Sequence, residues 1–435
     1  MTGFSADRAA AAELDATDPL AGLRELFIFD DPGLIYLDGN SLGRLPRATA
    51  ERIGQVVRDE WGAGLAGSWD RWIGLPMRAG DLLGEHLLGA AAGQVLVCDN
   101  TTVNLYKLAS AALDARPGRP VVITDDDNFP TDRYVLEGVA RQRGLELRLV
   151  NSDIDTGLGM SELRAALAAS GGQTALVSLS HVAYRSGAVL DLASVTAMVH
   201  GTGAMMLWDL CHSAGAVQVE LDASGADLAT GCTYKYLNAG PGSPAFLYVR
   251  RELQDQLRQP VWGWFGQRGQ FDMGPRYDPV RGIGQFLTGT PPVTGIAAVE
   301  EGTRLLAQAG IGQLRAKGMR LTDYLIALAD AWLAPLGCAL ASPRDAWRRG
   351  SHVCLHHPEA ARIAAALAAA GVVGDYRTPC RLRLGLAPAT TRYVDVWDAM
   401  DRLRQILEAA RFAPFHDEGL RGAAPPGQHS PAAGA

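Results

Sequence analysis

The chain has 435 residues, of which 48% are hydrophobic and 20% are charged. This composition predicts an ordinary water-soluble globular protein with enough core for two domains. The formal net charge of -7, without any basic stripe, argues against a nucleic-acid partner. The longest uncharged apolar run, "IAAALAAAGVVG" from Ile363, is too short and too rich in alanine to span a bilayer, so we expect no membrane partner.

Strand-like apolar runs alternate with helical stretches between about residues 90 and 250. In chain order the runs are "GQVLVCD", "PVVITDD", "LELRLV", "TALVSLSHV", "AMMLWDL" and "AFLYVR". Uninterrupted apolar runs separated by helices are typical of a mostly parallel sheet that helices cover on both faces. We therefore predict an α/β fold whose functional site lies beyond the carboxyl ends of the strands.

The pattern changes after about residue 295 to long helices rich in Ala and Leu, with short strands near "HVCLHH" and "CRLRLGL". This change predicts a smaller α+β C-terminal domain. We expect an N-terminal segment that packs with the small domain, a large domain, the small domain and a disordered tail, which cover residues 1–50, 51–295, 296–420 and 421–435.

The six cysteines are scattered and form no Cys-x-x-Cys pair, which fits a reducing compartment. The first twenty residues mix acidic and basic side chains among alanines and do not resemble a secretory signal. We therefore expect a cytoplasmic protein. The crowded stretch "SHVCLHH" alternates as a strand does, so we predict no metal site there.

Two charged residues follow neighbouring strand-like segments. Asp209 ends one run, His212 comes three residues later, and Lys235 lies in "TYKYLN" after the next segment. Such a pair can hold the two ends of pyridoxal 5'-phosphate, because the acid keeps the ring nitrogen protonated while the lysine forms an imine. Each residue alone also fits an ordinary role: Lys235 as a surface lysine lying along aromatic rings, and Asp209 as a helix cap.

The phosphate of that cofactor needs its own binding site, and "DNTTVNL" offers one. Thr101 and Thr102 open a predicted helix whose free amides and dipole favour an anion, although a Thr pair is also an ordinary cap. The stretch "DNFPTDRY" offers Phe129 to stack on the cofactor ring and Asp132 as a second acid. The order and placement of these groups together favour a pyridoxal-phosphate enzyme.

Other proteins would use the same residues. A cysteine desulfurase or an aminotransferase would also need Asp209 and Lys235, the first with a mobile catalytic cysteine and the second with a keto-acid partner. A cofactor-sensing regulator would carry a DNA-binding helix-turn-helix, which we do not find in the sequence. A cofactor-free structural protein would leave the agreement among these separate features unexplained.

The chain resembles the kynureninase family, whose members are pyridoxal-phosphate enzymes of the aspartate aminotransferase fold class. The matching stretches, between about residues 35 and 405, are "YLDGNSLGRLP", "FPTD", "HVAYRSG", "DLCHSAG", "TYKYLNAGPG", "GWFG" and "RLGLAPATTRYVDVWDA". The resemblance is to the bacterial type and implies hydrolysis of L-kynurenine to anthranilate and L-alanine in tryptophan degradation. It also implies a homodimer with the active site at the subunit interface.

The resemblance implies a role for each matching residue. Lys235 is expected to carry the cofactor, Asp209 to pair with its ring nitrogen, and Tyr234 to bind phosphate, to transfer a proton on the carbonyl side, or both. Further cofactor contacts are expected from Thr101, Thr102, Phe129, Asp132, Ser180 and His212, with Trp264 and Thr290 reaching in from the other subunit. Substrate contacts are expected from Arg383, Trp69 and Asn40.

Some details of the substrate site stay open. Arg383 is favoured as the clamp for the substrate carboxylate because the stretch after it aligns it, and Arg381 on the same strand face is the alternative. Gln267 follows "GWFG" where the family commonly has histidine, which predicts an altered contact near the substrate. Cys211 is interpreted as a small buried residue and not as a nucleophile.

The expected ring contacts predict which substrate is preferred. Animal relatives that favour 3-hydroxykynurenine have histidine and asparagine where this chain has Trp69 and Thr290. An apolar wall leaves a ring hydroxyl without a polar partner, so we predict a preference for L-kynurenine. Trp69 also fits an ordinary core tryptophan.

Overall fold

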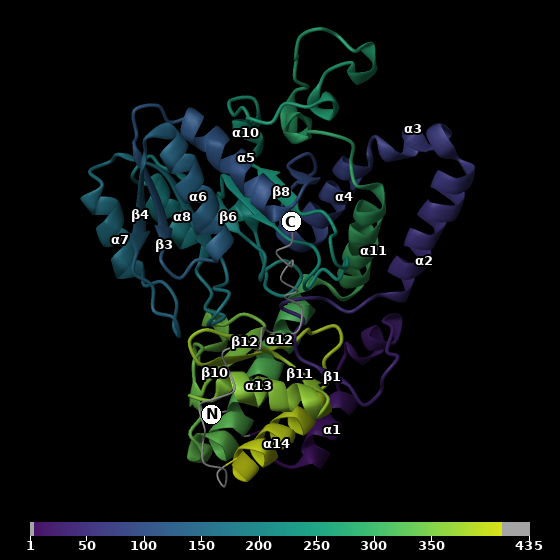
Figure 1. Ribbon diagram of the computed structural model, residues 1–435, viewed down its shortest axis with the longest axis vertical. Coiled ribbons are helices and arrows are strands. Elements are labelled where there is room, and N and C mark those ends of the chain that lie inside the picture. Colours follow the sequence, from purple (N-terminus) through teal and green to yellow (C-terminus); the bar gives the residue numbers. More distant parts are fainter. Residues whose placement is uncertain (1–3, 411–435) are drawn as a thin grey trace, which may run out of the picture.

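The computed structural model describes residues 4–410 and has two lobes, drawn one above the other in Figure 1. The upper lobe contains a seven-stranded sheet of order β2-β8-β7-β6-β5-β3-β4. Its strands are β2 Val95–Val97, β3 Val121–Asp125, β4 Glu146–Val150, β5 Thr174–Ser180, β6 Met205–Asp209, β7 Leu228–Gly231 and β8 Phe246–Val249. Only β8 runs antiparallel to its neighbours. The predicted mostly parallel sheet is therefore confirmed.

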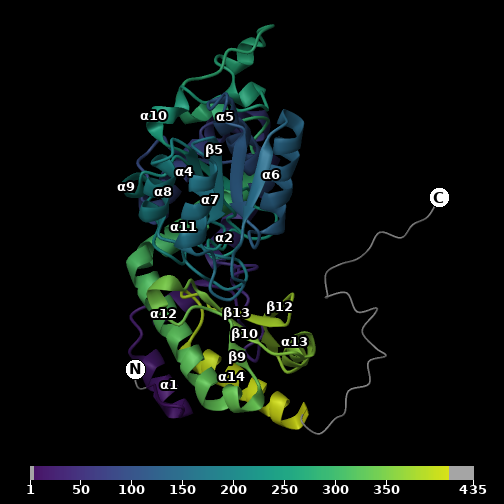
Figure 2. The ribbon, with the colours of Figure 1, turned by 90° about the vertical axis from the view of Figure 1, so that its left-hand side faces the viewer.

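Helices cover both faces of this sheet, and α6 and α8 lie on opposite sides of it in Figure 2. One face packs against α5 Thr101–Asp114 and α6 Pro130–Arg143. The other packs against α4 Leu75–Leu83, α7 Met160–Ala169, α8 Leu192–His200 and α11 Val293–Ala309. Side-chain caps fix two of the starts, since Asn100 accepts from the Val103 amide and Asp191 from the Ser194 amide.

The short strand β7 was not predicted from the sequence. Its four residues, "LATG", are small and contain no long apolar run, yet all four are buried between β6 and β8. Residues 209 and 230 are partners in the parallel β6–β7 pair. The loop after β7 therefore starts beside the end of β6, which brings Lys235 to the same edge as Asp209.

The lower lobe holds a four-stranded antiparallel sheet of order β12-β13-β10-β9. Its strands are β9 Ala339–Leu340, β10 His352–His356, β12 Asp375–Arg377 and β13 Arg381–Gly385. Three helices accompany them, α12 Ile311–Leu328, α13 Ala360–Ala369 and α14 Tyr393–Ala410. The remaining short elements are β1 Ile35–Tyr36, β11 Val372–Val373, α2 Arg47–Gln55, α3 Trp69–Trp72, α9 Leu221–Ser224 and α10 Arg251–Gln254.

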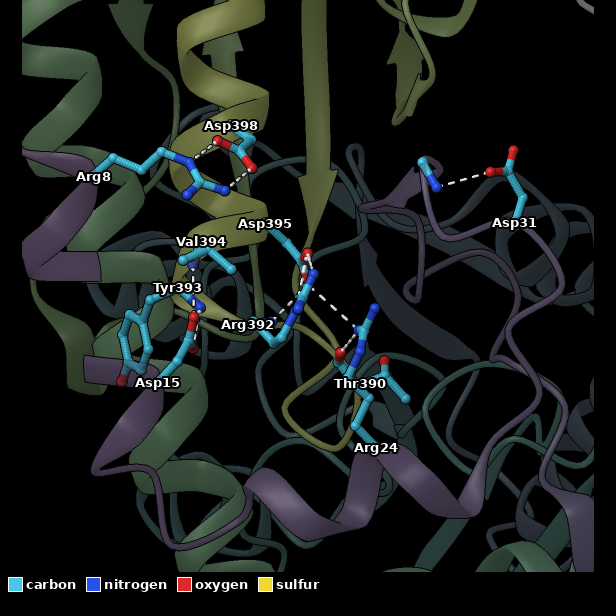
Figure 3. Close-up of polar contacts among 11 residues, drawn as sticks. Arg8, Asp15, Arg24, Asp31, Thr390, Arg392, Tyr393, Val394, Asp395 and Asp398 are labelled. Atoms are coloured by element: carbon cyan, nitrogen blue, oxygen red, sulfur yellow. Dashed lines mark hydrogen bonds and ion pairs between the residues drawn. The ribbon is translucent and has the colours of Figure 1, made fainter. Parts of the chain in front are cut away.

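The N-terminal segment packs against the lower lobe through α1 Arg8–Ala16, as Figure 3 shows. Arg8 forms a fork with Asp398 of α14, with N–O distances of 2.7 and 2.8 Å. The Asp15 carboxylate accepts the backbone amides of Tyr393 and Val394, which begin α14. These contacts tie the start of the chain to its last described helix.

The chain passes from the upper lobe to the lower lobe after residue 295, where the sequence pattern placed the boundary. Helix α11 packs against α2 and α4 and contributes Ile296 and Leu306 to the core of the upper lobe. Helix α12 then enters the lower core from Leu321 onward. We therefore propose a domain boundary within α12.

The expected tail at 421–435 lies outside the described residues. Within residues 4–410, no helix has both the length and the apolar character needed to cross a membrane.

Candidate active site

A cavity of about 190 Å³ opens at the carboxyl edge of the seven-stranded sheet. Its walls bring together Thr101, Thr102, Phe129, Asp132, Asp209, His212, Tyr234 and Lys235. These residues come from four separate segments of the chain, which meet where neighbouring strands of the sheet end. The cavity is therefore where the rule for open α/β sheets predicts a ligand site.

Asp209, the last residue of β6, is held in a fixed orientation. It is 5% exposed, and its Oδ1 accepts the Cys211 amide at 2.7 Å. Ser180 Oγ lies 3.2 Å from Asp209 Oδ2 and 2.7 Å from Asn128 Oδ1, so one hydroxyl joins the two side chains. Ser180 thus supports Asp209 from behind and does not line the cavity. Asn128 was missed from the sequence, although it directly precedes Phe129.

Asp132 faces Asp209 across the inner end of the cavity. Burial raises the pKa of Asp132 well above its usual range, and the charge of Asp209 raises it further. Its Oδ2 is buried without a hydrogen-bond partner among the described residues. Two buried acids side by side, one of them with a raised pKa, suit a positively charged N–H group, such as a protonated pyridine nitrogen.

Lys235 projects into the cavity beside His212, with 3.3 Å between Lys235 Nζ and His212 Nε2. Burial, followed by the charges of Lys235 and Arg383, lowers the pKa of His212 well below its usual range, so the imidazole is neutral. The same Nζ lies 6.0 Å from the centre of the Phe129 ring and 5.9 Å from that of Tyr234. Burial raises the pKa of Tyr234, which keeps its phenol protonated.

Hydroxyl groups and a helix start form another wall of the cavity. Thr101 and Thr102 begin α5, where backbone amides have no partner within the helix. Ser243, from "GPGS", joins them in the wall and lies 2.8 Å from Thr233 Oγ1 through its hydroxyl. Ser243 was not predicted from the sequence. A helix N-terminus surrounded by hydroxyls suits the predicted phosphate.

The stretch "GNSLG" lies between the lysine loop and the lower lobe. The Gly43 amide donates to the Tyr234 carbonyl at 2.8 Å, and a methyl group on Gly43 would lie 2.2 Å from the Lys235 oxygen. A methyl group on Gly385 would lie 1.4 Å from Asn40 Oδ1. Asn40 is fully buried, and its side chain has no hydrogen-bond partner among the described residues. Asn40 therefore lies against β13 and outside the cavity wall.

Arg383 of β13 is 1% exposed and is already paired within the chain. Its Nε lies 2.8 Å from Asp375 Oδ1, its Nη2 contacts Asp375 Oδ2, and its Nη1 donates to the Tyr184 carbonyl. Arg381 forms a separate fork with Asp155 at 2.7 and 2.8 Å. Of these two arginines, Arg383 is the one whose charge acts on His212. Arg383 therefore lies closer to the cavity chemistry than its neighbour does.

Three of the predicted contacts lie apart from this cavity. Trp264 belongs to the segment between α10 and α11 that rises at the top of Figure 1, and its ring packs edge-on against Trp69 at 6.3 Å. Thr290 is exposed. Gln267 Oε1 accepts the Asp278 amide at 2.7 Å, so its side chain holds this segment closed on itself. The cavity of one chain is thus assembled without Trp69, Trp264 or Thr290.

Cys211 lies in the cavity wall but lacks the character of a nucleophile. Cys211 is buried, and a hydrogen bond with Cys232, together with burial, raises the pKa of its thiol well above the usual range. A nucleophilic cysteine needs the opposite shift. Among residues 4–410, no group of three or more His, Cys, Asp or Glu side chains could hold a metal ion.

Known proteins resemble this chain in sequence and in fold. The family described as "Kynureninase C-terminal domain" matches residues 314–403. Kynureninases of Burkholderia pseudomallei and Pseudomonas fluorescens are each 46% identical to it, with 92% of this chain and 95% of the relative covered.

Among solved structures, a cysteine desulfurase from Thermococcus onnurineus NA1 matches with a TM-score of 0.76 at 17% identity, covering 92% of this chain and 98% of that one. An alanine–glyoxylate aminotransferase from Nostoc sp. matches with a TM-score of 0.66 at 18% identity, covering 87% and 96%. At such identities the structures share the fold alone. The sequence relatives are far closer and extend over nearly the whole chain, so the chain belongs to the kynureninase family, as its motifs predicted.

Proposed function

We propose that this chain hydrolyses L-kynurenine to anthranilate and L-alanine, with pyridoxal 5'-phosphate bound in the cavity around Lys235. The observation that carries the proposal is that one cavity holds a lysine, a fixed carboxylate and a hydroxyl-rich helix start. Family membership supports the choice of reaction. A structural neighbour, a C-DES variant, was solved with glycine covalently linked to its PLP cofactor.

Each end of the cofactor has a partner in the cavity. Lys235 Nζ would hold the cofactor through its aldehyde carbon, and neutral His212 at 3.3 Å can accept a hydrogen bond from the lysine amine. Asp209 would accept the ring N–H, and Ser180 behind it keeps the carboxylate in place. When bound, the protonated ring supplies a sink for the electrons of the broken carbon–carbon bond. Thr101 and Thr102 would hold the phosphate at the start of α5.

The chain's own residues then move protons and hold the substrate. Lys235, once its amine is free, is the base that takes the α-proton, because its Nζ is the amine in the cavity. Tyr234 keeps its phenol proton and can donate it to the oxygen that gains charge on the carbonyl side. Arg383 clamps the substrate carboxylate, which requires Asp375 to release part of its fork.

We assign Trp69, Trp264 and Thr290 to the active site of the neighbouring subunit in a homodimer. The aromatic contact between Trp69 and Trp264 lies outside the cavity of its own chain, which is what a wall for the neighbouring subunit's substrate requires. Asn40, buried against β13, supports the substrate side indirectly. We place the dimer in the cytoplasm, on the basis of the scattered free cysteines.

The direct test is borohydride reduction of the purified holoenzyme, followed by peptide mapping. A pyridoxyl group should appear on the peptide that contains Lys235, and the Lys235→Ala variant should carry none. Anthranilate fluorescence should appear with L-kynurenine and not with cysteine or with alanine plus 2-oxoglutarate. Label on another lysine would refute the site, and turnover of cysteine alone would refute the reaction.

A further inference from the structure

Lys107 is a buried charge behind the cavity that the reaction itself does not use. It lies in α5, the helix that begins with Thr101 and Thr102, and its side chain is 0% exposed. Nζ contacts Asp99 Oδ2 at 2.6 Å, the Phe286 carbonyl at 2.6 Å and Cys98 Sγ at 3.9 Å. All three ammonium donors therefore have a protein partner.

Fold stability alone is a weak explanation for this lysine. Removing an ammonium and a carboxylate from water costs free energy that their attraction often fails to recover, and an apolar side chain of similar volume is often as stable. Lys107 sits among the apolar residues that α5 packs against the sheet, where methionine would fit the surroundings. What the pair provides is a fixed position and charge for Asp99.

Asp99 is the residue from which the phosphate-binding segment starts. It has a φ of 47°, in the left-handed region that a non-glycine residue adopts only at a cost. Lys107 holds Oδ2, and Thr288 Oγ1 lies 3.2 Å from Oδ1. The next residue, Asn100, caps α5. The direction in which α5 begins therefore depends on a strained residue held from two sides.

The same lysine connects two regions that the reaction needs. Lys107 contacts the Phe286 carbonyl directly, and its partner Asp99 contacts Thr288, in the segment that leads to Thr290. The Thr288 carbonyl in turn accepts the Phe265 amide, next to Trp264. Lys107 thus joins the start of α5 to a segment of the same chain, whose Trp264 and Thr290 we assign to the active site of the neighbouring subunit.

We propose that Lys107 is a positioning residue for the cofactor phosphate. It neutralises Asp99, whose carboxylate would otherwise repel the phosphate dianion, and it fixes the backbone that leads into Thr101 and Thr102. The proposal rests on the proposed function, in which these two threonines bind the phosphate. It predicts a defect that is specific for the phosphate group and not for the pyridine ring or its aldehyde.

The chain offers a matched control for a buried lysine–aspartate pair. Lys317 of α12 lies 2.6 Å from Asp18, with side-chain exposures of 7% and 5%. This pair joins α12 to the N-terminal segment and touches no residue of the cavity wall. Lys317→Met therefore causes the same kind of charge loss, and much of the same destabilisation, without acting on the phosphate.

The experiment titrates the full-length apoenzyme with pyridoxal 5'-phosphate and with pyridoxal, and follows the absorbance of the lysine-bound aldehyde. The dissociation constant of pyridoxal divided by that of pyridoxal 5'-phosphate measures how strongly the phosphate is recognised. We expect Lys107→Met to reduce this ratio at least tenfold, with pyridoxal binding changed less than twofold. Lys317→Met should keep the wild-type ratio. A parallel loss of both ligands in Lys107→Met, or an unchanged ratio, would overturn the proposal.

A second variant covers the case in which Lys107→Met fails to fold because it leaves the Asp99 carboxylate without its ion-pair partner. The double variant Lys107→Met with Asp99→Asn has no unpaired charge, yet it lacks the ion pair that fixes the start of α5, so its ratio should stay below that of wild type. A wild-type ratio in the double variant would overturn the positioning role. Equal affinity of the wild-type protein for both ligands would instead refute the phosphate site itself, and with it the proposed function.

Discussion

The two halves of the candidate site differ in how their charged groups are engaged. In the upper half, Lys235 has one weak polar neighbour at 3.3 Å, and Asp132 has a buried oxygen without a partner. In the lower half, Arg383 is forked to Asp375 and its remaining nitrogen is on a carbonyl. The upper half thus has free groups for a ligand, whereas the lower half is closed by internal pairs.

This difference indicates which groups can bind a ligand at once and which must first leave a partner within the protein. A cofactor can enter the upper half and satisfy groups that lack partners, so its binding adds contacts without breaking any. A substrate carboxylate must compete with Asp375 for Arg383, so its binding exchanges one charged pair for another. We therefore expect substitutions in the upper half to abolish chemistry and those in the lower half to weaken substrate binding.

The largest effect is expected from Lys235→Ala. The variant loses both the attachment point of the cofactor and the base, so kcat should fall at least about 10⁴-fold. Steady-state anthranilate fluorescence at saturating cofactor measures the loss, and circular dichroism checks the fold. A residual kcat within about 100-fold of wild type would contradict the division between the halves.

Asp209→Ala should follow, with a loss of at least about 10²-fold in rate, or about 3 kcal/mol. The reason is that the ring nitrogen loses the buried carboxylate that keeps it protonated. Asp191→Ala is the matched control, because this acid caps α8 through the Ser194 amide and does not line the cavity. It should stay within about threefold of wild type. Activity of Asp209→Ala within a few-fold of wild type would refute its role.

Arg383→Lys tests the lower half. A lysine cannot form the two-pronged contact with a carboxylate, so kcat/KM should fall about 50-fold, mainly through a higher KM, which corresponds to about 2 kcal/mol. Arg381→Lys, two residues along β13 and paired with Asp155, is the matched control and should change KM less than threefold. The opposite ranking would assign the clamp to Arg381.

Buried His352 lies next to His212, and we expect it to make the stability of the fold depend on pH. Its ring is 5.6 Å from that of His212, and neither of its nitrogens has a hydrogen-bond partner among the described residues. Burial lowers the pKa of His352 well below its usual range, and the charges of Arg383 and Lys235 lower it further.

An unfolded histidine takes up a proton below about pH 6.5 and the folded one does not, so stability is full above that pH and falls below it. At pH 5 the unfolded histidine is mostly protonated, so the loss from His352 is at most about 2 kcal/mol. His352→Gln should remove this part of the acid sensitivity in urea unfolding at pH 7.5 and 5. His181 and His212 remain in both proteins, so only the difference between them reports on His352. Equal pH sensitivity would contradict the prediction.

The cavity half of the site could be largely predicted from the sequence. Long apolar runs such as β6 mark buried strands, and the polar residues that follow them must meet at one edge of a parallel sheet. The pairing of Arg383 with Asp375 could not be predicted, because Asp375 lies in the three-residue strand β12, which has no clear pattern. The sequence around Lys107 predicts an ordinary polar helix residue, yet tertiary packing buries its side chain completely. We propose that Trp264 and Thr290 act at the active site of a second chain, and the pattern of one chain does not show which residues would meet there.

The residues that we propose for the wall around the substrate's ring belong to neither half, and we expect the smallest effect from changing them. Trp69 packs against Trp264, and Thr290 is exposed. Such a wall offers flat apolar surface and few polar groups, so a 3-hydroxyl on the substrate loses water without gaining a partner. We therefore expect kcat/KM for L-kynurenine to exceed that for 3-hydroxykynurenine by about tenfold, or about 1.4 kcal/mol. Side-by-side steady-state assays measure the ratio, and Trp69→His with Thr290→Asn should bring it toward one. Equal preference in the wild type would refute the idea, and an unchanged ratio in the double variant would assign the selectivity to other residues.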